Sequence, residues 1–188
     1  SALFASAIVL VASLVLSVQF DAETAGSLQF ESGRTLLDIA AFPTLSLGFG
    51  IDGISLVLLL LSAIVLVAAV WVSPADAAVK GSAKLYYICL LLIAAGAIGA
   101  FCSTDLFFLY AFHELALIPT FLMIGMFGHG ETRVHTAWRI TIYLGVGSLV
   151  LLVGLILAVG ALGGSTFNIE ELIRLAKDPA TGIAENQQ

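Results

Sequence analysis

The stretch FLYAFHELALIPTFLMIG, Phe108–Gly125, places two ionisable side chains next to each other within a long apolar run. A carboxylate inside a membrane span costs a few kcal/mol, so such a residue usually faces protein or water and marks an ion or proton pathway. Glu114 lies roughly 13–14 Å along its helix from Asp105, near the centre of a bilayer. We therefore expect Glu114 to be a proton relay. The alternative is a protonated acid that only hydrogen-bonds a neighbouring helix.

Three nearby residues either assist Glu114 or pack beside it. His113 points about 100° away on the same helix, and an interhelical hydrogen bond explains it as well as proton shuttling does. Arg139, which opens the next apolar run, either extends to the membrane interface or reaches inward as a charge partner. Pro119 leaves the carbonyl of Leu115 without its helical donor, which predicts either a hydrated kink or a packing kink.

Other polar residues at the ends of apolar runs have simpler explanations. Asp52 and Asp105 each precede an apolar run, where a carboxylate caps a helix and complements its dipole. For Asp105 we prefer capping to a role in proton entry. Cys89 and Cys102 lack metal-ligand spacing, so we expect neither a metal site nor a cofactor site on this chain. The sequence also lacks a GxGxxG or GxxxxGK[ST] phosphate loop, so we expect no NADH chemistry here.

The composition places most of the chain in lipid. Of 188 residues, 60% are hydrophobic and only 11% are charged, whereas about a quarter of the residues of soluble domains are charged. Seven basic residues stand against 13 acidic ones, which argues against a nucleic-acid partner. The first segment, SALFASAIVLVASLVLSV, has no initial Met or basic region. We interpret it as a membrane span of a chain already under way, not as a signal peptide.

Five apolar stretches reach the roughly 20 residues that a transmembrane helix needs. They are about 2–20, 51–73, 84–102, 105–127 and 138–163. This pattern predicts an all-α, polytopic transmembrane helix bundle within residues 1–175, followed by a polar tail, 176–188, that we expect to be an artificial or unresolved chain end. Small residues predict close helix packing in two of the spans. They are Ala95 and Gly99, and then Gly145, Gly147, Gly154 and Gly160.

Loop charges predict an orientation. The long loop 21–50 is acidic, whereas the loops near 74–83 and 128–137, with their flanks, are basic. Their basic residues are Lys80, Lys84, Arg133 and Arg139. The positive-inside rule then places the first residue in the cytoplasm and the last residue outside, although Arg174 and Lys177 in the tail weaken the bias. We expect a multi-pass protein of a bacterial plasma (inner) membrane.

Four local patterns occur in order: GIDGISL, TDLFFLYAFHELALIPTFLMIGMFG, TAWRITIYLGVGSLVLLVG and STFNIEEL. Over about residues 1–175 the chain resembles the subunit M family (chain 4 in mitochondria) of respiratory complex I, the proton-pumping NADH:quinone oxidoreductase. The glutamate followed by Leu-Ile-Pro is shared with the wider group of antiporter-like subunits, including those of Mrp-type antiporters. The resemblance implies that Glu114 is the proton-channel acid. It also implies that Arg139 is the basic residue opening the next helix, and that His113 replaces a usual aromatic.

The resemblance further implies a fragment, whose first span matches the family's second. The chain would be a membrane-arm subunit that contributes part of an antiporter-like proton channel, and so a translocase component without redox chemistry of its own. FMN, iron–sulfur clusters and quinone would lie on other subunits. Its partners would be other membrane-arm subunits, including neighbouring antiporter-like ones, and the lipid bilayer. The alternatives are a Mrp-type cation/proton antiporter subunit and a structural membrane scaffold in which Glu114 only packs.

Overall fold

The computed structural model describes residues 2–24, 26–37, 44–73, 83–163 and 166–177. Five long helices dominate it, each long and apolar enough to cross a membrane. They are α1 (Ala2–Gln19), α2 (Gly53–Val72), α4 (Ala83–Cys102), α5 (Leu106–Phe127) and α6 (Arg133–Ala161). This confirms the predicted fold class. The predicted bounds are correct to within two residues, except at the start of α6.

α6 begins at Arg133, five residues before the predicted start of the span. The sequence prediction followed hydropathy, but the backbone is already helical in the polar segment, where the Thr136 amide donates to the Thr132 carbonyl at 2.9 Å. Residues 133–136 are exposed and form the first turn of the helix. Arg139 therefore lies in the second turn of α6 and does not open the helix.

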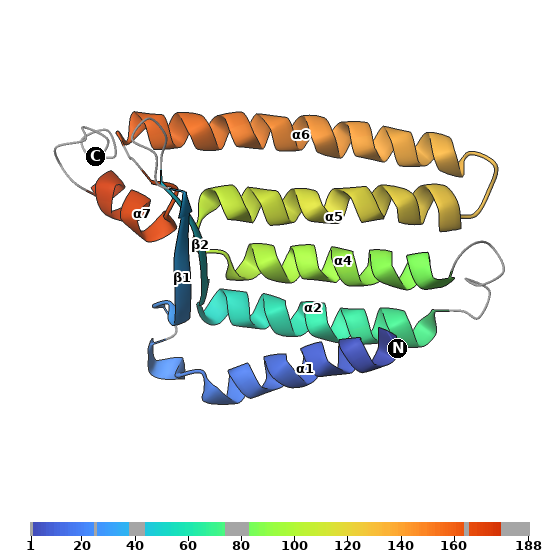
Figure 1. The fold of residues 1–188 in the computed structure, drawn as a ribbon, viewed down its shortest axis with the longest axis horizontal. Helices are drawn as coiled ribbons and strands as arrows, with labels where there is room; N and C mark the ends of the chain where they lie inside the picture. The colour runs from blue at the N-terminus through green and yellow to red at the C-terminus, as the bar shows by residue number, and fades with distance from the viewer. Residues whose placement is uncertain (1, 25, 38–43, 74–82, 164–165, 178–188) are drawn as a thin grey trace.

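The five helices lie side by side in a single row, in chain order (Figure 1). α1 packs on α2, α2 on α4, α4 on α5, and α5 on α6. Large apolar side chains are exposed along the row, among them Trp71, Ile118 and Tyr143. Lipid or further membrane helices are the surroundings that suit such faces, because exposed apolar surface is costly in water.

Small residues bring α4 and α5 into close contact. A Cβ atom on Gly96 would lie 2.8 Å from the carbonyl oxygen of Phe112, and one on Gly99 would lie 2.5 Å from the ring of Phe112. The predicted close packing is thus present at Gly99, whereas Ala95 is exposed and its neighbour Gly96 makes the other close contact. In α6, an added Cβ would meet no atom of the described chain within 4 Å at any of four glycines, Gly145, Gly147, Gly154 and Gly160. The close packing predicted there is not found within the described residues.

The connection between α1 and α2, expected from sequence to be a plain acidic loop, contains a short 3-10 helix, η1 (Ala22–Thr24), and two strands. β1 (Gln29–Leu37) and β2 (Leu45–Ile51) pair antiparallel, with Gly33 opposite Gly48. The strands cross one end of the helix row (Figure 1). Alternating apolar residues in β2 are a strand signal that hydropathy over longer windows conceals. They are Leu45, Leu47, Phe49 and Ile51.

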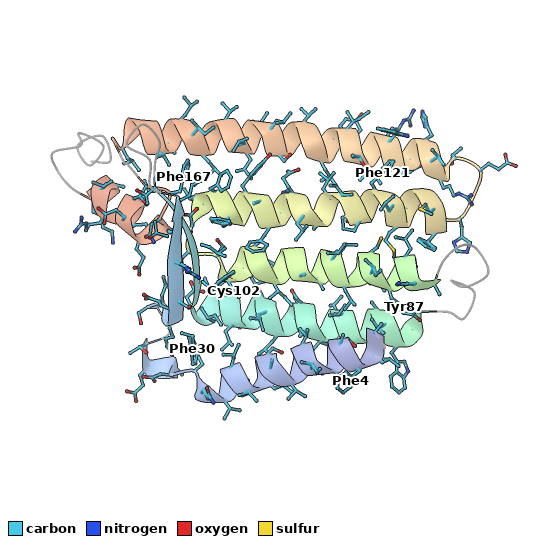
Figure 2. All side chains as sticks on the ribbon, in the orientation of Figure 1. Phe4, Phe30, Tyr87, Cys102, Phe121 and Phe167 are labelled. Carbon is cyan, nitrogen blue, oxygen red and sulfur yellow. The ribbon has the colours of Figure 1, made fainter. Side chains whose placement is uncertain are left out.

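The main apolar core lies at this sheet end of the row. Ile51, Leu56, Leu59 and Cys102 form a buried cluster against which Phe49 and neighbouring apolar residues pack. Figure 2 shows Cys102 at the end of α4, beside the strands. β2 and the helices α1, α2 and α4 are therefore held together at this end of the row.

A second short helix, α7 (Ile169–Lys177), follows α6 at the same end. Asn168 caps it, since its side-chain oxygen accepts from the amides of Glu170 at 3.0 Å and Glu171 at 3.2 Å. The predicted polar tail starts inside α7, and residues 178–188 lie outside the described part. Lys80, which the orientation prediction uses, also lies outside the described part.

Candidate functional site

Glu114 lies in the middle part of α5, about 12 Å from Leu106 at 1.5 Å of rise per residue. Its side chain is 33% exposed. The Oε1 atom is nevertheless buried and has no hydrogen-bond partner among the described residues. Leaving a buried polar atom unpaired costs about 1–3 kcal/mol. The carboxyl group therefore needs a proton, a water molecule or another polar group at this position.

The helix register places Glu114 at the contact between α5 and α6. The ring centroids of Phe121 and Trp138 are 5.1 Å apart, and a Cβ on Gly125 would lie 3.6 Å from Ala137. Glu114 precedes Phe121 by seven residues and Gly125 by eleven, which are about two and three helical turns. Residues at these spacings share one face of a helix. Glu114 thus faces α6.

A buried hydroxyl group on α6 lies at the same level. Ser148 is only 4% exposed and follows Ala137 by eleven residues, just as Glu114 precedes Gly125 by eleven. Because the two helices are antiparallel neighbours, this register places Ser148 opposite Glu114. The Ser148 hydroxyl donates to the Gly145 carbonyl at 2.9 Å, and its oxygen can still accept. Sequence reasoning missed Ser148. The signal available in the sequence was a polar residue that follows the small residue Ala137 by three helical turns, and so lies on the same face of the helix.

His113 is the ionisable group next to Glu114. Its Nδ1 lies 3.7 Å from Oε1 of Glu114, and its side chain is 49% exposed. It lines a cavity of about 250 Å³ formed by α4, α5 and α6, in which Thr120 is the other polar lining residue. No hydrogen bond from His113 to another helix is found in the described part of the chain. The two sequence explanations of His113 both stay predictions.

The structure does not bring Arg139 to Glu114. Arg139 is exposed and follows Trp138, which contacts Phe121. Glu114 is two turns of α5 away from Phe121, or about 10 Å along the axis. Within the described ranges the ion pairs are His113–Glu114 and Arg174–Glu171. The role of Arg139 as a charge partner stays a prediction, and it does not rest on direct contact in this conformation.

Pro119 lies inside α5, which continues through it. The Thr120 hydroxyl donates to the carbonyl of Ala116 at 2.7 Å, not to that of Leu115. Across the described residues, no side-chain hydrogen bond reaches the Leu115 carbonyl. The hydrated kink stays a prediction.

Asp105 caps α5, as predicted, and also joins α5 to the sheet. It is fully buried. Its Oδ1 accepts from the amides of Phe107 at 2.9 Å and Phe108 at 3.3 Å. Its Oδ2 accepts from the amide and the hydroxyl of Ser46 on β2, each at 3.3 Å. A carboxylate with four donors is well satisfied, so Asp105 positions the start of the helix that carries Glu114.

Asp52 caps α2, which also confirms its prediction. Its Oδ1 accepts from the Ser55 amide at 2.7 Å. That hydrogen bond is the main reason why the pKa of Asp52 lies below its usual value, and partial burial opposes the effect. Cys89 and Cys102 are buried free thiols. The described residues hold no group of three or more His, Cys, Asp or Glu that could bind a metal.

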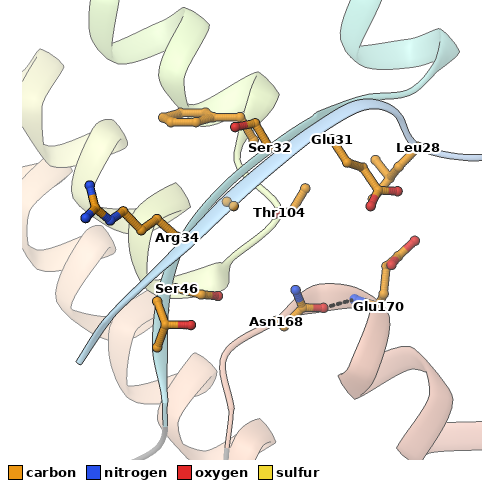
Figure 3. A pocket seen from close by; sticks show the side chains of 12 residues that line it. Leu28, Glu31, Ser32, Arg34, Ser46, Thr104, Asn168 and Glu170 are labelled. Atoms are coloured by element: carbon orange, nitrogen blue, oxygen red, sulfur yellow. Dashed lines mark hydrogen bonds between the residues drawn. The ribbon is translucent and has the colours of Figure 1, made fainter. Parts of the chain in front are cut away.

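A polar cavity of about 270 Å³ lies at the sheet end, between the strands and the start of α7 (Figure 3). Glu31 and Arg34 of β1 line it together with Thr104, Asn168 and Glu170. The backbone ties this region together, because the Ile169 amide donates to the Thr104 carbonyl at 2.9 Å. The cavity is separated from Glu114 by the first turns of α5.

The amino-acid sequence is similar to a described transmembrane family and to several curated proteins. Residues 103–187 match a family described as "NADH:quinone oxidoreductase/Mrp antiporter, TM". F(420)H(2) dehydrogenase subunit M of Methanosarcina mazei is 33% identical over 170 residues, which are 86% of this chain and 32% of that protein. NADH-quinone oxidoreductase subunit M of Escherichia coli K12 is 31% identical over 159 residues, covering 80% of this chain and 31% of that protein. The chain thus spans about a third of the length of these relatives.

Two solved structures share the fold. A chain of "Respiratory complex I from Thermus thermophilus with bound NADH" superposes with a TM-score of 0.74 at 24% identity, covering 92% of this chain and 34% of that chain. A chain of the Mrp complex from Dietzia sp. DQ12-45-1b gives a TM-score of 0.70 at 23% identity, covering 97% of this chain and 33% of that chain. At these identities the likeness shows the fold alone.

Proposed function

Because residues 103–187 match this transmembrane family and the chain resembles part of subunit M (chain 4) of respiratory complex I, we propose that it is a membrane-arm subunit of a proton-pumping NADH:quinone oxidoreductase. In this proposal it contributes part of an antiporter-like proton channel, with Glu114 as the relay acid. The observation that carries the proposal is the Glu114 carboxyl group in the middle of α5, with one buried oxygen that accepts no hydrogen bond from the described residues. A group in that state gains from holding a proton.

Glu114 would bind a proton as a neutral acid and release it when a nearby charge or water stabilises the carboxylate. The helix register places Ser148 opposite Glu114. The Ser148 hydroxyl group can accept a hydrogen bond from the protonated acid or, after rotation, donate one to the carboxylate. No electron transfer is assigned to this chain. FMN, iron–sulfur clusters and quinone would lie on other subunits, and distant quinone chemistry would act on Glu114 through electrostatic coupling. The protein would sit in a bacterial inner membrane beside other antiporter-like subunits.

Replacing Glu114 by Gln tests the proposal in the intact parent complex. The amide keeps the size and hydrogen-bonding capacity but cannot release a proton at this position. We expect Glu114→Gln to assemble normally and to lose most proton pumping, together with the quinone reduction coupled to it. Glu114→Asp should retain part of the rate, because it keeps an acid on a shorter side chain. Proton uptake by inverted vesicles and quinone reduction are the measurements.

Glu31→Gln is the matched control, because Glu31 lies at the sheet end. It should pump at the wild-type rate. A fully assembled Glu114→Gln complex that also pumps at the wild-type rate would make Glu114 a packing group and favour the structural scaffold. Co-purification separates the Mrp-type alternative: flavin and iron–sulfur subunits support complex I, whereas small Mrp subunits would replace it by a cation/proton antiporter.

A further inference from the structure

The cavity between α4, α5 and α6 lies on the side of α5 where His113 projects. It is open on one side and mostly apolar, and its volume of about 250 Å³ is enough for several water molecules, since each occupies about 30 Å³ in the liquid. Water needs polar partners to stay in such a space. His113 and the hydroxyl of Thr120 are the polar side chains on its wall, and they lie seven residues, or two turns, apart on α5.

The remaining walls of this cavity carry no charge. α4 contributes Gly96, Ala97, Ala100 and Phe101, and α6 contributes Leu144. The titratable residues of the two packed helices line no part of it. On α4 these are Lys84, Tyr86, Tyr87, Cys89 and Cys102, and on α6 they are Arg133, His135, Arg139 and Tyr143. His113 is therefore the titratable group that faces this space.

Glu114 lies on a different face of α5 from His113. Its register points it to the α5–α6 contact opposite Ser148, and its Oε1 is buried there. The same oxygen lies 3.7 Å from Nδ1 of His113. His113 thus has one ring nitrogen near the carboxyl group and the body of its ring at the cavity. The pair connects a space that can hold water to an oxygen that no described residue hydrogen-bonds.

We infer that His113 is a proton relay between water in this cavity and Glu114. The inference rests on the proposed function and adds the group that delivers the proton. A hydronium ion in the cavity gives a proton to Nε2, whose lone pair forms the new N–H bond, and leaves water. The Nδ1–H bond then breaks, its electron pair stays on the ring, and the proton joins Oε1 of Glu114. The products are neutral imidazole, now protonated on Nε2, and a carboxylic acid. The first tautomer returns when Nε2–H gives its proton to cavity water and Nδ1 takes one proton from water.

The separation of 3.7 Å is longer than a direct hydrogen bond of about 2.7–3.2 Å. Both side chains are partly exposed, so rotation about their side-chain bonds can shorten the gap, and one bridging water can also close it. Hydrogen bonds used in proton transfer are often long in resting structures. The observed geometry is therefore a resting state one rotamer change or one water away from transfer.

Variants of His113 test this relay in the intact parent complex. His113→Gln keeps a polar side chain of similar reach but cannot carry the proton. We expect it to assemble normally, to pump at least about tenfold more slowly, and to lose a titration step from the pH profile of pumping. His135→Gln is the control, because His135 is an exposed residue in the first turn of α6. It should leave both the rate and the profile unchanged.

Chemical rescue separates proton delivery from packing. His113→Ala opens space next to the cavity, and free imidazole added to vesicles of that variant should restore part of the pumping rate. Assembled His113→Gln with the wild-type rate and pH profile would overturn the relay. So would a slow His113→Gln with an unchanged profile, combined with no imidazole rescue of His113→Ala. Loss of pumping in Glu114→Gln alongside normal His113→Gln would remove only this inference, whereas normal Glu114→Gln would remove the proposed function as well.

Discussion

At the scale of single residues, the acidic side chains in and beside the spans differ in how many hydrogen bonds they accept. Asp105 accepts four hydrogen bonds and Asp52 is tied to the Ser55 amide. These hydrogen bonds hold both carboxylates at the starts of their helices. Both capping roles could be predicted from the sequence, because each acidic residue stands in front of an apolar run. Glu114 has a buried oxygen without such a partner in the described part. The proposed proton relay rests on this difference between Glu114 and the capping residues.

The same contrast gives a ranking of Glu114 against Arg139. Arg139 is exposed and lies nearer to the helix end, so water can partly replace its guanidinium group. No water-exposed group replaces an acid in the middle of the span. We expect Arg139→Ala to lower coupled pumping less than Glu114→Ala does, measured at equal assembly. An Arg139 variant that pumps worse than the Glu114 variant would reverse the ranking and make the arginine the more important charge.

At the scale of elements, sequence reasoning located helices well but not their partners. Span length follows from the width of the bilayer, so five apolar runs were enough to predict the five long helices. Packing partners depend on which face of an apolar helix meets protein, and Leu or Val suits lipid and protein equally. The glycines of α4 and α6 looked alike in sequence, yet only those of α4 meet a described neighbour. The sequence analysis did not predict the two strands, because the alternation of apolar and other residues in β2 extends over only a short segment.

This difference between glycines can be tested with one pair of substitutions. Gly96→Ala would place its Cβ 2.8 Å from the backbone oxygen of Phe112, which cannot move away without shifting α5. We expect it to destabilise the protein by about 1–3 kcal/mol, seen as a lower thermal unfolding midpoint of the purified parent complex. Gly154→Ala has open space around it, and replacing a helical glycine adds about 0.5–1 kcal/mol of helix stability. Equal midpoints for the two variants would contradict the observed α4–α5 contact.

At the scale of the whole molecule, the row of helices has two chemically different ends. One end holds the sheet and α7, with acidic residues that include Glu31, Asp52 and Glu170. The other end holds the α5–α6 turn and the starts of α4 and α6, where Lys84 and Arg133 lie. The alternation of ends along the chain matches the five-span prediction. The orientation stays a prediction. The positive-inside rule favours the end with Lys84 and Arg133 in the cytoplasm, although Arg34, Arg174 and Lys177 lie at the sheet end.

Cysteine labelling in sealed vesicles tests both the alternation and its direction. A thiol at Ser27, before β1, and one at Thr132, before α6, lie at opposite ends of the row. We expect Ser27→Cys to react with an impermeant maleimide from the outer side and Thr132→Cys from the cytoplasmic side. Cys89 and Cys102 are buried, so their background should be low, and replacing both by Ala provides the control. Labelling of both sites from one side would disprove the five-span alternation, because three spans separate them. Labelling from opposite sides in the reverse sense would keep the fold and overturn the orientation, and would place the α5–α6 turn on the outer face.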